Sequence, residues 1–150
     1  MCDSLFCGRR FRTLNIVDDF SREALAIEID VGLSAERVQR VLGRVVAWRG
    51  YPSKLRMDNG PEFISTTLAD WAEEHTVELE FIQPGKPTQN SYIERFNRTY
   101  RDEVLNMYVF KTLSEVRLIT EEWMDQYNEE RPHDALGDLT PFEYRWAHQA

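Results

Sequence analysis

The hydrophobic period changes along this chain, and that change restricts the possible folds more than any other feature of the sequence. Near the N-terminus, apolar and β-branched residues form two short runs at 13–18 and 23–30, joined by turn-forming residues at 19–22. Runs of this length and composition predict β-strands. The Gly8-Arg9-Arg10 segment predicts an earlier hairpin turn, which implies an incomplete first strand before it.

Beyond residue 33 the apolar residues recur at helical spacing. Ser34 is a good N-cap for a helix that runs to about Trp48 and stops at Gly50. Three further elements are expected: a strand at 54–57, a helix at 61–75 that has a proline in its first turn, and a strand at 77–82. This order of elements predicts an α/β protein with a mixed β-sheet flanked by helices.

The rest of the chain is predicted to be mostly helical, after a Pro- and Gly-containing loop at 83–89. One helix is expected over 90–107, with an apolar stripe formed by Ile93, Phe96, Tyr100, Val104 and Met107. A last helix, from about 112 to 130, is expected to bury Leu113, Val116, Ile119, Trp123 and Tyr127. At 150 residues we expect a single domain over 1–150, with a C-terminal helical extension from about 112 to 150.

The charge balance excludes one way of binding nucleic acid. The formal net charge is −8, whereas bulk attraction to phosphate requires an excess of Lys and Arg. Any contact with DNA must therefore be local, or shared with a part that is absent from this sequence. The sequence has neither a long apolar run nor a basic segment followed by an apolar stretch at its start, so we expect a cytoplasmic location.

Two carboxylates stand at positions typical of catalytic sites. Asp58 follows the predicted strand at 54–57 and precedes a predicted helix, at the sheet edge where α/β proteins place their sites. Glu94 follows after 35 intervening residues and shares one helix face with Arg98 and Arg101, at spacings of four and seven residues. Each feature also has a simpler interpretation: Asp58-Asn59-Gly60 as a turn, and the charged face as solvated ion pairs.

Several segments together resemble the integrase core of insertion-sequence transposases, a family with an RNase H-like fold and two aspartates and a glutamate as catalytic residues. Met57-Asp-Asn-Gly-Pro-Glu-Phe63 resembles the segment around the second aspartate, and residues 84–97 resemble the segment leading into the glutamate. The C-terminal signature of the insertion-sequence subgroup numbered three resembles the segment Tyr127-Asn-Glu-Glu-Arg-Pro-His133, together with Leu136 and Thr140-Pro141. In that subgroup the signature belongs to the product of the second reading frame. The resemblance spans nearly the whole chain.

The resemblance implies DNA transposition by metal-dependent phosphoryl transfer. Asp58 and Glu94 would be catalytic metal ligands for Mg²⁺ or Mn²⁺, in a site that holds two ions when complete. Arg98 and Arg101 would contact the DNA backbone of the transposon end. Lys86, Gln89 and Asn90 are further expected DNA contacts, although ordinary loop residues remain an open interpretation for these three.

The sequence departs from the family pattern at the first aspartate. Alignment of the Gly8-Arg9-Arg10 turn places that residue a few positions before Asp3, ahead of Met1, so we expect a core truncated at its N-terminus. Asp3 is a weak candidate substitute, because strand residues two apart share a face. We expect little or no strand transfer from these 150 residues alone. Asp18 and Asp19 also match family positions, as turn-capping residues.

Two other functions stay open at the level of sequence. An RNase H-like nuclease or resolvase would keep the fold, but the Asn-Gly after Asp58 and the 127–133 segment favour a transposase. A catalytically inert relic, or an inhibitory subunit of a transposase multimer, would keep the fold without the chemistry. For the transposase core we expect DNA, both transposon ends and target, as a partner, and either a homo-oligomer or co-assembly with a full-length transposase.

Overall fold

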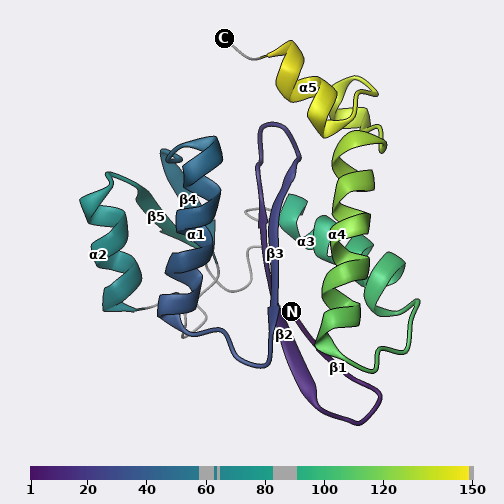
Figure 1. The fold of residues 1–150 in the computed structure, drawn as a ribbon. Helices are drawn as coiled ribbons and strands as arrows, with labels where there is room; N and C mark the ends of the chain where they lie inside the picture. Colours follow the sequence, from purple (N-terminus) through teal and green to yellow (C-terminus); the bar gives the residue numbers. More distant parts are fainter. Residues whose placement is uncertain (58–62, 64, 83–90, 149–150) are drawn as a thin grey trace. The chain divides into compact units, whose positions relative to one another are not determined.

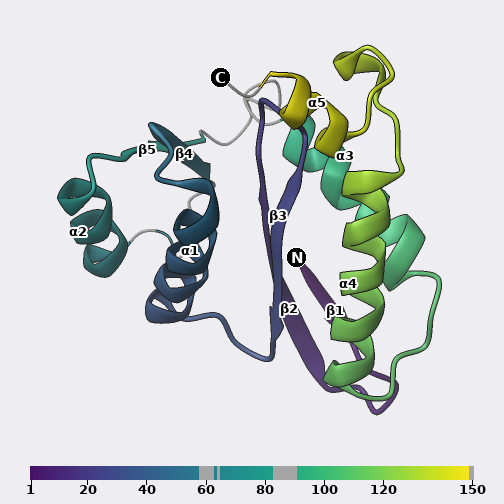
Figure 2. The same ribbon diagram turned by 45° about the horizontal axis from the view of Figure 1, so that its top comes forward.

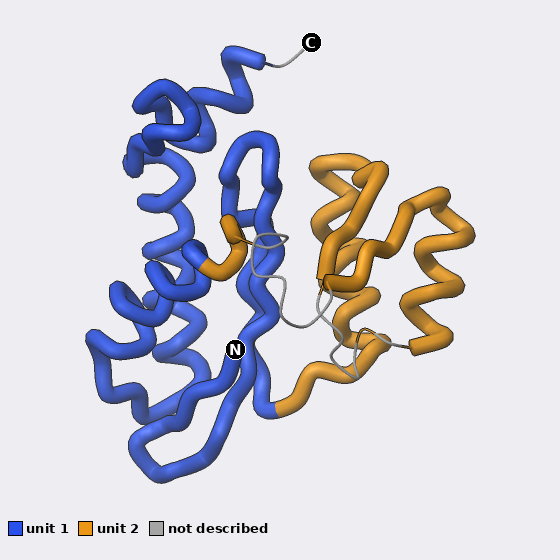
Figure 3. The backbone as a smooth tube through the Cα atoms, turned by 180° about the vertical axis from the view of Figure 1, so that it is seen from behind, with its two compact units in different colours: residues 1–31, 95–150 blue, residues 32–94 orange. Residues whose placement is uncertain are grey.

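The computed structural model describes residues 1–57, 63, 65–82 and 91–148. The chain divides into two compact units, one made of residues 1–31 and 95–150 and the other of residues 32–94, coloured separately in Figure 3. The expectation of a single domain over 1–150 stays a prediction.

An antiparallel sheet forms the centre of the first unit. Its strands are β1 (Cys2–Ser4), β2 (Arg10–Val17) and β3 (Ala24–Asp30), in the order β1-β2-β3. Gly8 has a φ of 90°, a conformation that glycine adopts without steric cost, and it sits in the tight turn between β1 and β2. The predicted strands and the first hairpin are confirmed.

The side chain of Asp18 stabilises the turn between β2 and β3, as predicted from the sequence. The Asp18 carboxylate accepts the backbone N–H of Phe20 at 2.8 Å, while the Asp18 N–H donates to the carbonyl of Glu23 at 2.9 Å. An aspartate that bonds the backbone two residues on stabilises a turn locally. The expected capping role of Asp18 is therefore confirmed.

Helices from the C-terminal half cover one face of this sheet (Figures 1 and 2). They are α3 (Ser91–Tyr100), the π-helical turn η2 (Arg101–Leu105), α4 (Leu113–Glu129), the 3₁₀ turn η3 (Asp134–Leu136) and α5 (Pro141–Ala147). Thr112 caps α4 by accepting the Glu115 N–H, and Thr140 and Glu143 form a capping box on α5, with Pro141 in its first turn.

Aromatic side chains form the core between α3 and α4. The ring of Phe96 lies 5.6 Å from Trp123 and 5.2 Å from Tyr127, and Tyr100 lies 5.3 Å from Trp123. These contacts are edge-on or tilted, the arrangements that aromatic quadrupoles favour. Burying an aromatic side chain of this size contributes roughly 1.5–3 kcal/mol. The core therefore fixes the spacing between the two helices.

The predicted apolar stripe of residues 90–107 is wrong at its end. Met107 is 67% exposed, while Leu105 is 4% exposed and takes the inward position. The cause is η2, where the Asn106 N–H donates to the carbonyl of Arg101, five residues back. A π-helical turn advances the chain by one extra residue and therefore shifts the α-helical phase. Three other residues predicted to line helix cores are half-buried: Ile93, Leu113 and Ile119.

The second unit contains a parallel strand pair and two helices: α1 (Ala35–Arg49), β4 (Lys54–Met57), α2 (Thr66–Glu74) and β5 (Glu78–Phe81). Ser34 caps α1 by accepting the Arg37 N–H, as predicted, and Gly50 ends the helix with a φ of 81°. Antiparallel and parallel pairing are thus both present, in two separate ladders.

One helix boundary in this unit differs from the expectation. The described helix α2 begins at Thr66, with Ser65 as its N-cap, and Phe63 stands in a turn; the predicted start at Pro61 lies outside the described residues. A serine hydroxyl that accepts the N–H three residues on is a strong start signal, and here it bonds Leu68 at 3.2 Å. Within the described residues, no helix has the length and apolar character that a membrane crossing requires.

Candidate active site

The expected site residues divide into those that the structure describes and those that it does not. Asp58, Lys86, Gln89 and Asn90 lie outside the described residues. Glu94, Arg98, Arg101 and Asp3 are described, and all except Asp3 belong to the continuous helical segment formed by α3 and η2.

Glu94 lies in the first turn of α3 and is exposed to solvent. Among the described residues, none forms a hydrogen bond or an ion pair with its carboxylate. The helix dipole favours an acidic residue in the first turn of a helix, which is where Glu94 lies. The oxygens of Glu94 are therefore open to a ligand as far as the described part of the chain is concerned.

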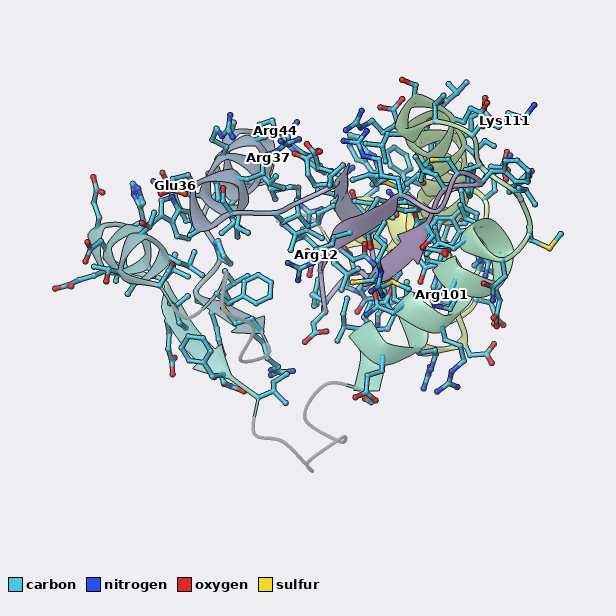
Figure 4. The ribbon with its side chains drawn as sticks, turned by 90° about the horizontal axis from the view of Figure 1, so that it is seen from below. Arg12, Glu36, Arg37, Arg44, Arg101 and Lys111 are labelled. Atoms are coloured by element: carbon cyan, nitrogen blue, oxygen red, sulfur yellow. The ribbon has the colours of Figure 1, made fainter. Side chains whose placement is uncertain are left out.

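Arg98 and Arg101 differ in what they contact. Arg98 is exposed, and its guanidinium bonds no other described residue. Arg101 is half-buried; it donates to the backbone carbonyl of Cys2 at 2.9 Å and lies 3.9 Å from the Asp3 carboxylate. Figure 4, where Arg101 is labelled, shows it beside the sheet strands. Arg101 thus fastens β1 to the helix that carries Glu94.

Asp3 has its own local partners. Its carboxylate accepts the N–H of Ser4 at 2.8 Å in addition to facing Arg101, and its backbone pairs with Phe11 of β2. Asp3 is also close enough to Tyr100 to disfavour ionisation of the phenol. These contacts give Asp3 a structural role at the junction of β1 with the helix.

A second contact between the sheet and α3 was not foreseen from the sequence. The Asn15 Nδ2 on β2 donates to the Asn97 Oδ1 on α3 at 2.7 Å, and it lies 3.1 Å from the Met1 sulfur. Asn15 pairs with Ile27 in β3 and lies on the same strand face as the buried residues Phe11 and Thr13. An amide at an inward strand position is the only sequence signal for this contact.

Hydrogen bonds also join α3 and η2 to α4. The Tyr100 hydroxyl bonds the Thr120 hydroxyl at 2.7 Å inside the core, and burial raises the pKa of Tyr100 to about 12. The Glu103 carboxylate accepts from Trp123 at 3.1 Å and also pairs with Arg131. Burial raises the pKa of Glu103, but the hydrogen bonds from Arg131 and Trp123 outweigh it and hold that pKa below its ordinary value.

The C-terminal signature residues prove to be structural. Asn128 accepts the Ala24 N–H at 2.8 Å and donates to the Ala24 carbonyl at 2.9 Å, so it binds the backbone of β3 at both polar groups. The buried Glu23 carboxylate accepts from Arg145 of α5 at 2.9 Å. Asn128 therefore secures α4 to β3, and Arg145 secures α5 to the turn before β3.

The donor set fits a hard cation as far as it is described. Glu94 offers carboxylate oxygen, the ligand type that Mg²⁺ and Mn²⁺ prefer, without a competing described partner. Outside residues 58–62, 64, 83–90 and 149–150, no three metal-ligating side chains come together. Glu94 can therefore act as one ligand of a site whose remaining ligands lie elsewhere.

Comparison with solved structures identifies the class of fold. The catalytic core domain of the HTLV-2 integrase, solved in complex with magnesium in a trimeric form, matches with a TM-score of 0.71 at 12% sequence identity. The match covers 96% of this chain and 90% of the viral domain. The chain therefore has the RNase H-like α/β fold of retroviral integrase catalytic cores.

Bacterial insertion elements encode similar sequences. An uncharacterized 31.7 kDa protein of insertion element IS407 from Burkholderia multivorans is 49% identical over 148 residues, which cover 99% of this chain and 53% of the relative. An uncharacterized 39.2 kDa protein of insertion element IS476 from Xanthomonas euvesicatoria is 43% identical over 142 residues, covering 95% of this chain and 41% of the relative. The chain spans about half the length of these relatives or less.

The integrase core domain family matches residues 2–87, and a second integrase core domain description matches residues 75–141. The chain belongs to the integrase core domain family.

Proposed function

We propose that this chain is the catalytic core of an insertion-sequence transposase that cleaves DNA and joins its ends by metal-dependent phosphoryl transfer. The observation that carries the proposal is the exposed Glu94 carboxylate on α3, without a described partner, in a chain of the integrase core domain family. The similarity to proteins of two insertion elements supports transposition over other reactions of RNase H-like proteins.

Asp58 and Glu94 are the proposed ligands of Mg²⁺ or Mn²⁺. Bound in a pair, such ions activate the attacking oxygen and stabilise the leaving oxygen of a phosphodiester. The contribution of the chain is to present carboxylate oxygens at fixed positions. Glu94 is fixed because its helix is held by the aromatic core, by Tyr100 and by Asn97.

The DNA backbone is the proposed partner of the cations near Glu94. Arg98 is exposed, bonds no other described residue, and lies one helical turn beyond Glu94, so its guanidinium can reach a phosphate. Arg101 has five N–H donors and uses part of them on β1, which leaves donors for DNA. Lys86, Gln89 and Asn90 remain proposed contacts. For Asp3 we favour the anchoring role over metal ligation, because Arg101 already neutralises it.

The proposed working form is an oligomer, either of this chain or with a full-length transposase. The HTLV-2 core was solved as a trimeric form, which supports assembly of cores of this fold.

The metal-binding part of the proposal is tested by titrating the purified chain with Mn²⁺ and measuring the free ion by electron paramagnetic resonance. Glu94→Gln removes a proposed ligand and is expected to raise the dissociation constant by more than about 10-fold, the smallest loss seen when only the groups that orient a metal ligand are changed. Glu122→Gln, an exposed change of the same chemistry on α4, should have no effect. Equal Mn²⁺ affinity of wild type and Glu94→Gln would refute the assignment.

A further inference from the structure

The hydrogen bond between Asn15 and Asn97 joins β2 to α3. The amide at position 15 lowers folding stability in a way that an apolar side chain there would not. Asn15 Nδ2 is bonded to Asn97, but Asn15 Oδ1 is buried and has no hydrogen-bond partner among the described residues. A buried polar atom left without a partner has lost its hydration with nothing in return, which lowers stability. Leucine has nearly the same shape and would avoid this cost. The amide at position 15 therefore contributes something other than stability.

The Asn15–Asn97 bond adds a restraint on α3 from the side of the sheet. On the α4 side, α3 is held by the ring contacts of Phe96 and Tyr100 and by the Tyr100–Thr120 hydrogen bond. A hydrogen bond is directional and weakens steeply away from linear geometry. The Asn15–Asn97 bond approaches α3 from the strand, so it limits rotation of α3 about its own axis.

Rotation of α3 matters because of where Asn97 sits. Asn97 lies three residues after Glu94, and residues at this spacing are neighbours on a helix surface. Glu94 is exposed, Phe96 is 1% exposed, and Asn97 is half-buried between the two faces. Holding Asn97 thus sets the direction in which the neighbouring Glu94 projects.

We infer that Asn15 is a positioning residue of the metal site: through its hydrogen bond to Asn97 it fixes the rotation of α3 and with it the carboxylate of Glu94. This inference rests on the proposed function, in which Glu94 is a metal ligand. It assigns a role in metal binding to a strand residue that is not itself a proposed ligand. It also gives a function to a buried amide whose oxygen has no described partner.

The test measures Mg²⁺ affinity and stability separately in the purified chain. The variants are Asn15→Leu, Asn97→Leu and the double variant, with Mg²⁺ binding followed by the backbone amide signals in NMR and stability followed by thermal unfolding. Each of the three is expected to weaken Mg²⁺ binding by about tenfold, the lower end of the range for groups that orient metal ligands. The melting temperature of the double variant should not fall, because the two substitutions together remove the unpaired oxygen and leave neither amide without its partner.

The matched control is Thr13→Val, on the same face of the same strand. The Thr13 hydroxyl is likewise buried without a described partner, but it does not bond α3. This variant should bind Mg²⁺ like wild type. A purely structural role for polar groups on β2 would affect Thr13→Val and Asn15→Leu alike.

The double variant shows whether Asn15 acts through Asn97. Equal effects of the single and double variants support the inference, whereas effects that multiply would overturn it, since the two residues would then act independently. The variant Glu94→Gln distinguishes a failure of the positioning role of Asn15 from a failure of the proposed function. If Glu94→Gln weakens Mg²⁺ binding and the Asn variants do not, the positioning role fails and the proposed function stands. If Glu94→Gln has no effect either, both fail.

Discussion

Asn128 shows how much one side chain can contribute to holding a helix on a sheet. Its amide satisfies both the N–H and the carbonyl of Ala24, which is 2% exposed. Asn128→Ala would leave two buried backbone groups unpaired and should lower the free energy of unfolding by about 1–3 kcal/mol. Urea denaturation followed by circular dichroism measures this. Gln126→Ala, exposed on the same helix, should change little; equal losses in both variants would contradict the role of Asn128.

His133 makes stability depend on pH. Burial, followed by the charges of Arg131 and Arg22, lowers the pKa of His133 below its ordinary value of 6.5, so the folded chain favours the neutral ring. The unfolded chain takes up this proton more readily, and the stabilisation is therefore present above pH 6.5 and lost as the pH falls below it. From pH 7.5 to 5.5 the melting temperature of wild type should fall more than that of His133→Gln. Parallel curves for the two proteins would contradict this.

At the scale of elements, the contact between α3 and α4 includes one buried polar pair. Tyr100 and Thr120 are 0% and 1% exposed, and their hydroxyls bond each other at 2.7 Å. Tyr100→Phe and Thr120→Val each leave the remaining buried hydroxyl without a hydrogen-bond partner. Each should therefore lower the free energy of unfolding by about 1–3 kcal/mol. The double variant removes both hydroxyls, so its cost should be less than the sum of the single costs. Strict additivity in urea unfolding would show that the two groups do not interact.

Elements were predictable where their signals are local. Ser34 and Thr112 cap helices through bonds to residues three positions away, and the strands at 13–18 and 23–30 follow from short apolar runs. The π-turn was not predictable, because Met107 continues the α-helical period and only the fold shows that Leu105 takes the inward place. The bond from Asn15 to Asn97 joins residues 82 positions apart, a pairing that no local pattern can reveal.

The candidate site residues were predictable from family resemblance rather than from local structural signals. Asp58 and Glu94 were assigned from the resemblance of their surrounding segments to a family, not from periodicity. Charge alone could not separate Arg98 from Arg101, since both share the face of Glu94; the structure shows that Arg101 is partly committed to β1. Membership of the integrase core domain family confirms the resemblance itself. The roles of the individual residues stay proposals.

At the scale of the whole molecule, an acidic chain that binds DNA must rely on a few cations. If Arg98 contacts a phosphate, Arg98→Gln should reduce the slope of log affinity against log salt by about 0.9 for duplex DNA. Fluorescence anisotropy with a labelled duplex at several salt concentrations measures this slope. Lys111→Gln, in the loop before α4 and labelled in Figure 4, is the matched control and should leave the slope unchanged. An unchanged slope in Arg98→Gln would remove Arg98 from the interface.

The central claim is that Asp58 and Glu94 hold divalent cations in one site. Iron-mediated cleavage tests it most directly, because Fe²⁺ occupies oxygen-rich Mg²⁺ sites and, with ascorbate and peroxide, cuts the backbone next to the ion. The account predicts fragments that end near residues 58 and 94, that are suppressed by excess Mg²⁺ and that are lost in Glu94→Gln. Cleavage elsewhere, or cleavage that persists unchanged in Glu94→Gln, would contradict it.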